Sequence, residues 1–142
     1  MRKRKVLVLC TGNSCRSIMA EALINHNLGE QWQAFSAGVE PAGRVSPRAI
    51  QVLQELGLDT SSLRSKSVKE FLDREDLDLV VTVCDHARET CPIFPRPVKQ
   101  IHVPFEDPHA YMTETDEIAL RKYRETRDRI RSELLPLLKK MK

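Results

Sequence analysis

Residues 10–17 read Cys10-Thr11-Gly12-Asn13-Ser14-Cys15-Arg16-Ser17, and this short stretch decides the fold. It follows the apolar run Val6–Leu9 and precedes helix-forming residues that start at Ile18. A strand, a tight polar turn and a helix start place backbone N–H groups around one small space, where they bind an anion. Gly12 and Asn13 tolerate the left-handed backbone conformations that such a turn needs. The sequence therefore predicts an oxyanion-binding loop between a strand and a helix.

Two side chains give this loop its chemistry. The thiol of Cys10 faces the N–H groups and the positive end of the following helix, an environment that favours the thiolate. Arg16, six positions later, carries a planar guanidinium that suits a tetrahedral oxyanion. Cys15 is expected to be a packed side chain rather than a reactive one. The predicted oxyanion-binding residues are Thr11, Gly12, Asn13, Ser14, Cys15, Arg16 and Ser17.

Length and composition limit the class of protein. At 142 residues the chain is expected to form a single domain, 1–142, that buries a proper core. The net charge of +3 is too small to indicate a nucleic-acid partner. No apolar run approaches a membrane span, and the run Val6–Cys10 is shorter than the apolar core of a signal peptide. We expect a cytoplasmic monomer with no membrane partner.

Strands and helices are expected to alternate along the chain. The expected strands are Lys5–Leu9, Trp32–Ser36, Leu77–Val83 and Gln100–Val103. Helices are expected over Ser17–Asn27, Arg48–Leu56, Val68–Arg74 and Thr115–Lys140, and residues 84–97 are expected to form a loop or a short helix. Strands separated by helices imply a parallel sheet with right-handed crossovers. The predicted fold class is α/β, a flavodoxin-like three-layer domain in which helices flank a four-stranded parallel sheet.

Apolar spacing predicts which helix faces are buried. On the first helix the expected inner residues are Ile18, Ala22 and Leu23, and on the second they are Ile50, Leu53 and Leu56. On the last helix they are Ile118, Tyr123, Ile130, Leu134 and Leu138. Pro136 is expected to kink that helix, because proline removes a backbone hydrogen bond.

Two further cysteines, Cys84 and Cys91, flank a short segment after the third predicted strand. Carboxyl ends of parallel strands meet at one edge of a sheet, so Cys84 is expected near Cys10. Thiols kept reduced in the cytoplasm indicate catalysis or metal binding before structural disulfides, and a redox relay fits this placement. A zinc site is the rival interpretation, but its spacing is unusual and its only nearby extra ligands are His86 and His102.

The loop resembles the phosphate loop of the low-molecular-weight protein tyrosine phosphatase family, which has Cys, five residues, Arg and then Ser. Its sequence is similar to that of the thioredoxin-coupled arsenate reductases within that family. The resemblance covers most of the chain, from Val6 to about Ile130. It implies an enzyme that binds arsenate, with phosphate or sulfate as analogues, and reduces it to arsenite without a cofactor or metal.

The resemblance also implies roles for individual residues. The two redox cysteines of that branch follow a strand rich in Val and Thr, and they correspond to Cys84 and Cys91. The acid that protonates the departing oxygen precedes a proline, and it corresponds to Asp107, with Glu106 as the fallback. Cys10 attacks arsenic, a disulfide passes from Cys10–Cys84 to Cys84–Cys91, and thioredoxin reduces it.

Two other functions stay open at this point. One is a phosphatase that acts through a phosphocysteine; against it, His109 follows Asp107-Pro108 where such phosphatases tend to carry tyrosine. The other is a non-catalytic oxyanion-binding or redox-sensing protein, which would need no acid at position 107. A departure from the reductases is Lys66, which stands roughly where some of them carry an aspartate that serves a potassium site.

Overall fold

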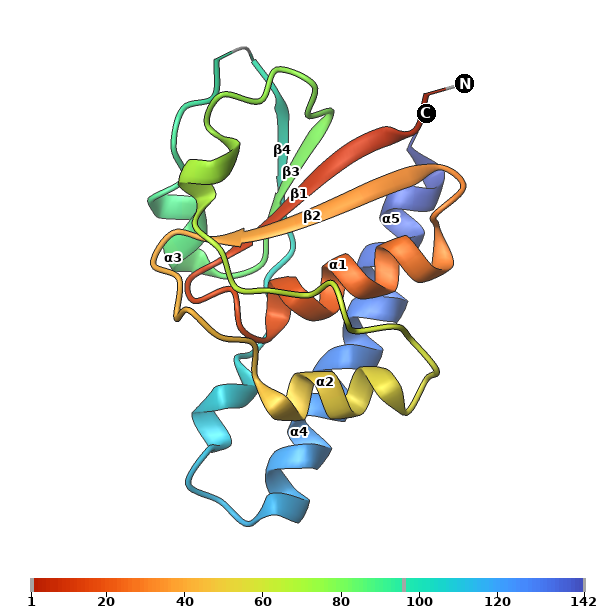
Figure 1. Ribbon diagram of the computed structural model, residues 1–142, viewed down its shortest axis with the longest axis vertical. Coiled ribbons are helices and arrows are strands. Elements are labelled where there is room, and N and C mark those ends of the chain that lie inside the picture. The colour runs from red at the N-terminus through yellow and green to blue at the C-terminus, as the bar shows by residue number, and fades with distance from the viewer. Residues whose placement is uncertain (1, 96, 142) are drawn as a thin grey trace.

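One parallel sheet organises the protein. The computed structural model describes residues 2–95 and 97–141 of the 142-residue chain. Within them, four strands lie in the order β2-β1-β3-β4, and neighbouring strands pair in parallel (Figure 1). Their bounds are β1 Arg4–Cys10, β2 Trp32–Gly38, β3 Leu79–Thr82 and β4 Lys99–His102. This confirms the predicted four-stranded parallel sheet.

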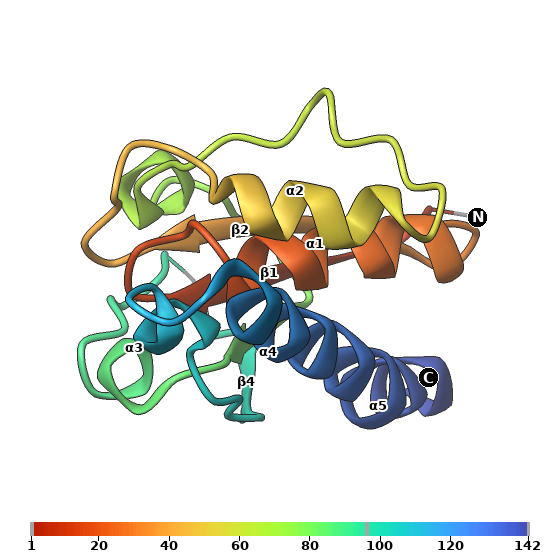
Figure 2. The ribbon, with the colours of Figure 1, turned by 90° about the horizontal axis from the view of Figure 1, so that it is seen from below.

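Helices cover both faces of the sheet. They are α1 Arg16–Asn27, α2 Pro47–Gln54, α3 Asp85–Glu89, α4 Asp116–Arg129 and α5 Leu135–Lys140. Short 3₁₀ turns form at η1 Val68–Phe71 and η2 Pro108–Tyr111. Figure 1 shows α1, α4 and α5 on one side of the sheet and α3 and η1 on the other, and Figure 2 shows α2 beside α1. The arrangement is the predicted three-layer fold.

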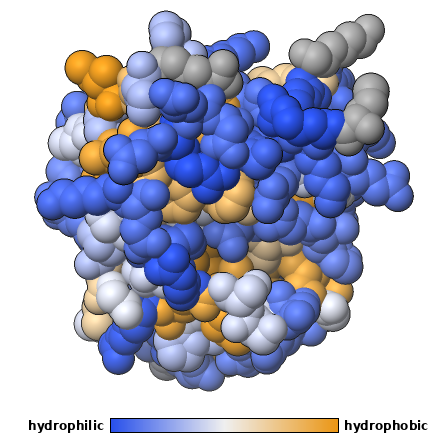
Figure 3. Space-filling model, turned by 45° about the horizontal axis from the view of Figure 1, so that its top comes forward, coloured by the Kyte–Doolittle hydropathy of each residue, from blue (hydrophilic) through white to orange (hydrophobic). Residues whose placement is uncertain are grey.

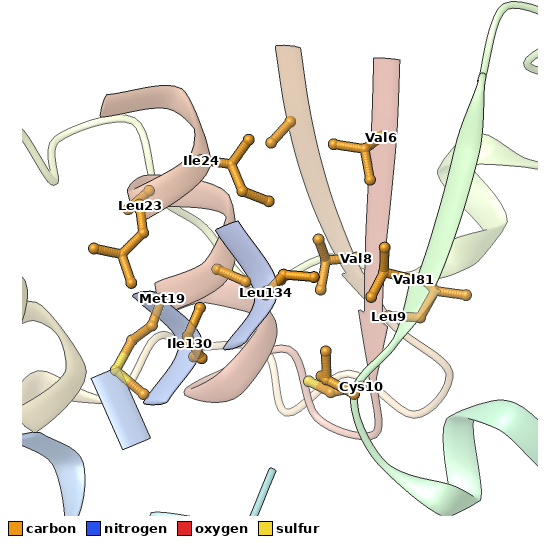
Figure 4. Close-up of a cluster of buried hydrophobic side chains, with 14 of the residues drawn as sticks. Val6, Val8, Leu9, Cys10, Met19, Leu23, Ile24, Val81, Ile130 and Leu134 are labelled. Carbon is orange, nitrogen blue, oxygen red and sulfur yellow. The ribbon is translucent and has the colours of Figure 1, made fainter. Parts of the chain in front are cut away.

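The core lies between β1 and the helices of one face. Val6, Val8 and Leu9 have no exposed surface, as expected for a strand that is apolar throughout. Side chains of α1 and of the last helical region meet those of β1 in one cluster (Figure 4). The face seen in Figure 3 is mainly hydrophilic, with its apolar side chains in separate patches. Among the described residues, no helix has both the length and the apolar character to cross a membrane.

Two helix faces differ from the prediction. In α1, Met19, Ala20 and Ile24 are buried in addition to the three expected residues, because the helix lies between the sheet and the C-terminal helical region. In α2 the buried residues are Ala49, Val52 and Leu53, whereas Ile50 and Leu56 are only partly buried. The apolar residues of α2 are spaced so that either of two adjacent helix faces could be buried. Packing against α4 determines which face is buried.

The predicted last helix is divided by a π-helical turn, η3 Ile130–Leu134. Pro136 lies in the first turn of α5 and has no N–H for the carbonyl four residues earlier. A wider turn immediately before it accommodates this missing bond. Ile130, Leu134 and Leu138 are nevertheless fully buried, as predicted.

Gly38 fixes the end of β2 against the loop at 10–17. A Cβ on Gly38 would lie 2.6 Å from the carbonyl oxygen of Thr11 and 3.0 Å from the backbone nitrogen of Asn13. Backbone atoms cannot move aside as a flexible side chain would. The position therefore requires glycine because of close approach.

Replacing Gly38 with alanine is expected to destabilise the protein by about 1–3 kcal/mol, because β2 or the loop must shift. Urea unfolding of both proteins measures this. Gly12→Ala is the matched control, since its Cβ would meet no atom closer than 3.7 Å. An unfolding midpoint for Gly38→Ala equal to that of the unaltered protein would contradict the close approach.

Candidate active site

The carbonyl groups of the loop at 10–17 are held by the segment that follows β2. Four backbone hydrogen bonds, 2.8–3.1 Å long, join them: Val39 N to Cys10 O, Glu40 N to Thr11 O, Ala42 N to Gly12 O and Ser46 N to Ser14 O. A loop whose carbonyls are occupied in this way keeps its N–H groups for an anion. The loop is therefore a rigid cradle before any ligand arrives.

Two donors lie against the sulfur of Cys10, which is 2% exposed. The backbone N–H of Asn13 donates to Sγ at 3.2 Å, and the hydroxyl oxygen of Ser17 lies 2.8 Å from Sγ. Because Asn13 Nδ2 donates to that same oxygen at 2.7 Å, the Ser17 hydroxyl is left to donate to the sulfur. The fold thus directs two hydrogen-bond donors at the sulfur that the sequence predicts to be the nucleophile.

Asn13 shapes the loop from inside. Its φ of 50° lies in the left-handed region, as the sequence predicted for this position. The side chain has no exposed surface, and its Oδ1 accepts from the backbone N–H of Lys66 at 2.9 Å. One residue therefore connects the nucleophile, through Ser17, to the chain behind the loop.

Arg16 and Asp107 face each other across the loop. Their closest atoms, Nη2 and Oδ2, are 3.5 Å apart, and Arg16 Nη1 donates to the Phe105 carbonyl at 3.3 Å. The other Asp107 oxygen accepts from the N–H of His109 at 2.9 Å, which fixes the carboxyl at the start of η2. Glu106 instead contacts the hydroxyl of Tyr111. Of the two candidate acids, Asp107 is the one beside the oxyanion loop.

A cavity of about 750 Å³ opens over this loop. Cys10, Arg16 and Asp107 contribute to its lining, and so do groups that the sequence did not single out as site residues. These additional lining residues include Arg44, Ser46, Arg48, Met112 and Tyr123. Most of them belong to loops or helix ends that reach the site only through the tertiary fold.

Cys84 lies against the same loop. Its Sγ is 3.3 Å from the hydroxyl oxygen of Thr11 and accepts from the backbone N–H of Ala87 at 3.4 Å, so that Cys84 is the N-cap of α3. The strand register explains this position: the N–H of Val83 donates to the Leu9 carbonyl at 2.9 Å, one residue before each cysteine. The structure thus brings Cys10 and Cys84 to one edge of the sheet.

Cys91 is held apart from Cys84 by α3. It is half-buried, its S–H donates weakly to the Pro92 carbonyl at 3.7 Å, and burial raises the pKa of its thiol. All four cysteines are free thiols. The two histidines of the rival zinc interpretation are engaged elsewhere, His86 with Glu40 at 3.3 Å and His102 with Asp85 at 2.8 Å. Across the described residues, no group of three or more His, Cys, Asp or Glu side chains is placed to hold a metal ion.

Cys15 is packed beneath the loop. Its Sγ lies 3.4 Å from the Tyr123 hydroxyl, and burial raises the pKa of the thiol. Tyr123 also accepts from the Ser46 hydroxyl at 3.0 Å, and burial raises its own pKa. The apolar spacing predicted Tyr123 only as a core residue. A tyrosine among aliphatic inner positions is the signal that pointed to a polar contact there.

A buried ion pair supports the loop from below. The ammonium of Lys66 lies 3.4 Å from both Glu21 Oε1 and Ser36 Oγ, and it donates to the Arg64 carbonyl at 3.1 Å. The side chains of Lys66 and Glu21 are only 8% and 12% exposed. Because the backbone N–H of Lys66 also holds Asn13, the ion pair and the loop form one unit.

Comparison with known proteins places this geometry in a family. The sequence model of the low molecular weight phosphotyrosine protein phosphatases matches residues 5–142. The chain belongs to that family. An arsenate reductase of Halalkalibacterium halodurans is 42% identical over 130 residues, covering 92% of this chain and 91% of the relative. Arsenate reductase 1 of Bacillus cereus is 42% identical over 132 residues, covering 87% and 96%.

Solved structures of the family superpose on the whole fold. An arsenate reductase in its phosphate-binding state has a TM-score of 0.73 at 27% identity and covers 98% of this chain and 99% of its own. A low-molecular-weight protein tyrosine phosphatase from T. tengcongensis has a TM-score of 0.77 at 31% identity, covering 98% and 100%. A thioredoxin-dependent arsenate reductase from Corynebacterium glutamicum has a TM-score of 0.67 at 26% identity, covering 98% and 64%.

The Lys66 ammonium already occupies the space between Glu21 and Ser36, so a monovalent cation is not needed there. We predict that the melting temperature and the affinity for phosphate are the same in potassium chloride and in tetramethylammonium chloride at equal ionic strength. Differential scanning fluorimetry and titration calorimetry measure these two quantities. In Lys66→Met, Glu21 loses the ammonium of its buried ion pair. The free energy of unfolding is therefore expected to fall by about 3–5 kcal/mol in both salts. A strong, specific gain with potassium in the unaltered protein would contradict this assignment.

Proposed function

We propose that the protein reduces arsenate to arsenite by a three-cysteine relay that thioredoxin recycles. The observation that carries the proposal is the 3.3 Å contact between Cys84 Sγ and the Thr11 hydroxyl, which holds a second thiol against the loop of the nucleophile. A phosphatase needs no such thiol, whereas a reductase must collect two electrons beside the bound oxyanion. We further propose that residues 1–142 act as one domain in the cytoplasm, as a monomer without a prosthetic group.

The first step binds and activates arsenate. Backbone N–H groups of the loop and the Arg16 guanidinium take its oxygens, as they would take phosphate or sulfate. The Cys10 thiolate attacks arsenic, and one oxygen departs as water with a proton from Asp107. The 3.5 Å separation of Arg16 and Asp107 supports this role for the acid. The product is a Cys10 thioester of arsenic in its +5 state.

The second step releases arsenite. Cys84 attacks Cys10 Sγ, the sulfur–arsenic bond breaks, and its electron pair stays on arsenic, which becomes arsenic(III). The two sulfurs lose those two electrons as the Cys10–Cys84 disulfide forms. One disulfide for each arsenate matches the two-electron change. Contacts with the Thr11 hydroxyl at 3.3 Å and the Ala87 N–H at 3.4 Å hold the attacking sulfur of Cys84 near the loop of Cys10.

The third step moves the oxidation outward. Cys91 attacks Cys84, which frees Cys10 and leaves a Cys84–Cys91 disulfide for thiol exchange with thioredoxin. Burial raises the pKa of Cys91, so this thiol is protonated at neutral pH in the reduced protein. It becomes a nucleophile when the segment opens and water reaches it. This order keeps Cys91 inactive until Cys84 has reacted.

Phosphate ester hydrolysis is the second candidate function. The 750 Å³ cavity exceeds the needs of one oxyanion, and Cys10, Arg16 and Asp107 would also serve a phosphocysteine mechanism. At the position after Asp107-Pro108, however, the cavity lining has His109 rather than a tyrosine, and Tyr123, which also lines the cavity, is only 2% exposed. Aryl phosphates would find little stacking surface there. We therefore place this activity second.

Single substitutions separate the two functions. Cys10→Ser is expected to abolish both arsenate reduction and aryl phosphate hydrolysis, since both start at this sulfur. Cys84→Ser and Cys91→Ser are expected to lose recycled reduction and keep any hydrolysis. Cys15→Ser is the matched control and keeps measurable turnover. Arsenite formation with thioredoxin, thioredoxin reductase and NADPH is the assay, and normal recycling by Cys91→Ser would end the relay proposal.

The relay also requires α3 to unfold. α3 covers only Asp85–Glu89, and Cys84 and Cys91 lie beyond its opposite ends. Its five residues at about 1.5 Å rise already separate its first and last Cα atoms by roughly 6 Å, and a disulfide tolerates at most about 7 Å between the Cα atoms of its two cysteines. Amide hydrogen exchange across residues 85–90 is therefore expected to be faster in the oxidised protein than in the reduced one. Mass spectrometry of peptic fragments measures it. Equal protection in both states would mean that the disulfide forms on a preformed loop.

A further inference from the structure

The first residue of α3 is fastened to the edge of the sheet. Asp85 directly follows Cys84, and its Oδ1 lies 2.8 Å from Nε2 of His102 at the end of β4. The other ring nitrogen of His102, Nδ1, lies 2.8 Å from the hydroxyl oxygen of Thr82 in β3. A single imidazole therefore joins two strands to the helix that separates the relay cysteines.

The hydrogen-bond roles follow from the partners. A carboxylate only accepts, so His102 Nε2 carries a proton and donates it to Asp85. In the neutral ring Nδ1 is then an acceptor, and the Thr82 hydroxyl donates to it. Thr82 is 2% exposed, so its hydroxyl cannot donate to water instead. The ring is thus oriented by the sheet before it meets α3.

Other contacts of this helix are weaker. His86 approaches Glu40 at 3.3 Å, and Arg88 approaches Asp85 at 4.0 Å, with side chains that are 44–73% exposed. The His102 side chain is only 18% exposed. Exposed ion pairs contribute little, and Asp85 is itself 73% exposed, but His102 is shielded and is held in place by Thr82 before it meets Asp85. The contact from His102 is therefore the principal polar attachment of the side chains of α3 to the sheet.

Forming the Cys84–Cys91 disulfide breaks this attachment. Asp85 is bonded to Cys84 through one peptide unit, so it moves when Cys84 turns toward Cys91. α3 lies between the two cysteines, so bringing their Cα atoms within the about 7 Å that a disulfide tolerates unwinds the turn that Asp85 begins. The contact between His102 and Asp85 is thus made in the dithiol state and lost in the disulfide state.

We propose that His102 is a positioning residue that holds α3 in the dithiol state and so sets the redox balance of the relay. The inference rests on the proposed relay between Cys84 and Cys91. When the pair is oxidised, two thiols lose two protons and two electrons to an external disulfide, which is reduced to two thiols. The contact from His102 disfavours oxidation of the pair until Cys84 has reacted with Cys10.

The test measures the equilibrium of that step. A background of Cys10→Ser and Cys15→Ser leaves Cys84 and Cys91 as the only thiols, and glutathione redox buffers supply the oxidant and the reductant. Alkylation followed by mass spectrometry counts the free thiols at each ratio of glutathione to its disulfide. The variants are His102→Ala, Asp85→Ala and the two combined. His26→Ala, an exposed histidine of α1, is the control.

Each single variant is expected to favour the disulfide about fivefold, the effect of one hydrogen bond lost from the dithiol state. At 29.6 mV for each tenfold change this lowers the midpoint potential by about 20 mV. The combined variant is expected to shift no further than either single one, because both remove the same contact. His26→Ala is expected to shift nothing.

Three results would overturn the inference. One is an unchanged thiol–disulfide equilibrium in Asp85→Ala, which would mean that the contact has no influence on the relay. The Asp85 side chain is 73% exposed, so its loss does not threaten folding. Additive shifts in the combined variant would assign the two residues separate, merely structural effects. Absence of the Cys84–Cys91 disulfide at every buffer ratio in every background would overturn the relay itself, and the role of His102 with it.

Discussion

The close approach of β2 to the oxyanion loop is the constraint on which the rest of the structure depends. Register pairs Cys10 with Gly38, and the chain that follows β2 takes the carbonyls of the loop one after another. A side chain at position 38 would collide with backbone atoms of the loop. Because those carbonyls are held, the N–H groups need no rearrangement when an anion arrives. The site is ordered during folding, so no binding energy is needed to order it when the anion binds.

The segments on the two sides of β1 differ in how firmly they are held. On the β2 side, the buried Lys66 and Glu21 pair and the backbone contact to Asn13 keep the cradle fixed. On the β3 side, Cys84 is the N-cap of a helix of only five residues. A parallel sheet brings both to the same edge because strand ends coincide there. A rigid loop and a thiol at the start of a short helix thus lie side by side without belonging to the same segment.

The parts that could be predicted from sequence depend on local patterns. The apolar run before Cys10 and the strand before Cys84 placed both thiols at one edge, and the position of Asn13 followed from its tolerance of positive φ. The buried faces of α1 and α2, the π-helical turn before Pro136 and the cavity lining depend on contacts between distant segments. Lys66 lies between these two cases: the resemblance to the reductases drew attention to position 66, but nothing near it in the sequence indicates that its ammonium is buried beneath the loop.

The short length of α3 couples its stability to the redox state of Cys84. A helix of five residues is not stable alone, so it persists through contacts with the rest of the protein. These are the buried Ala87, the contact from His102 and the cap in which Cys84 Sγ accepts from the Ala87 N–H. When that sulfur enters a disulfide with Cys91, it leaves the cap. In the proposed relay, oxidation therefore removes one of the supports of α3 and reduction restores it, so the same sulfur atom would carry the electrons and influence the fold of its segment.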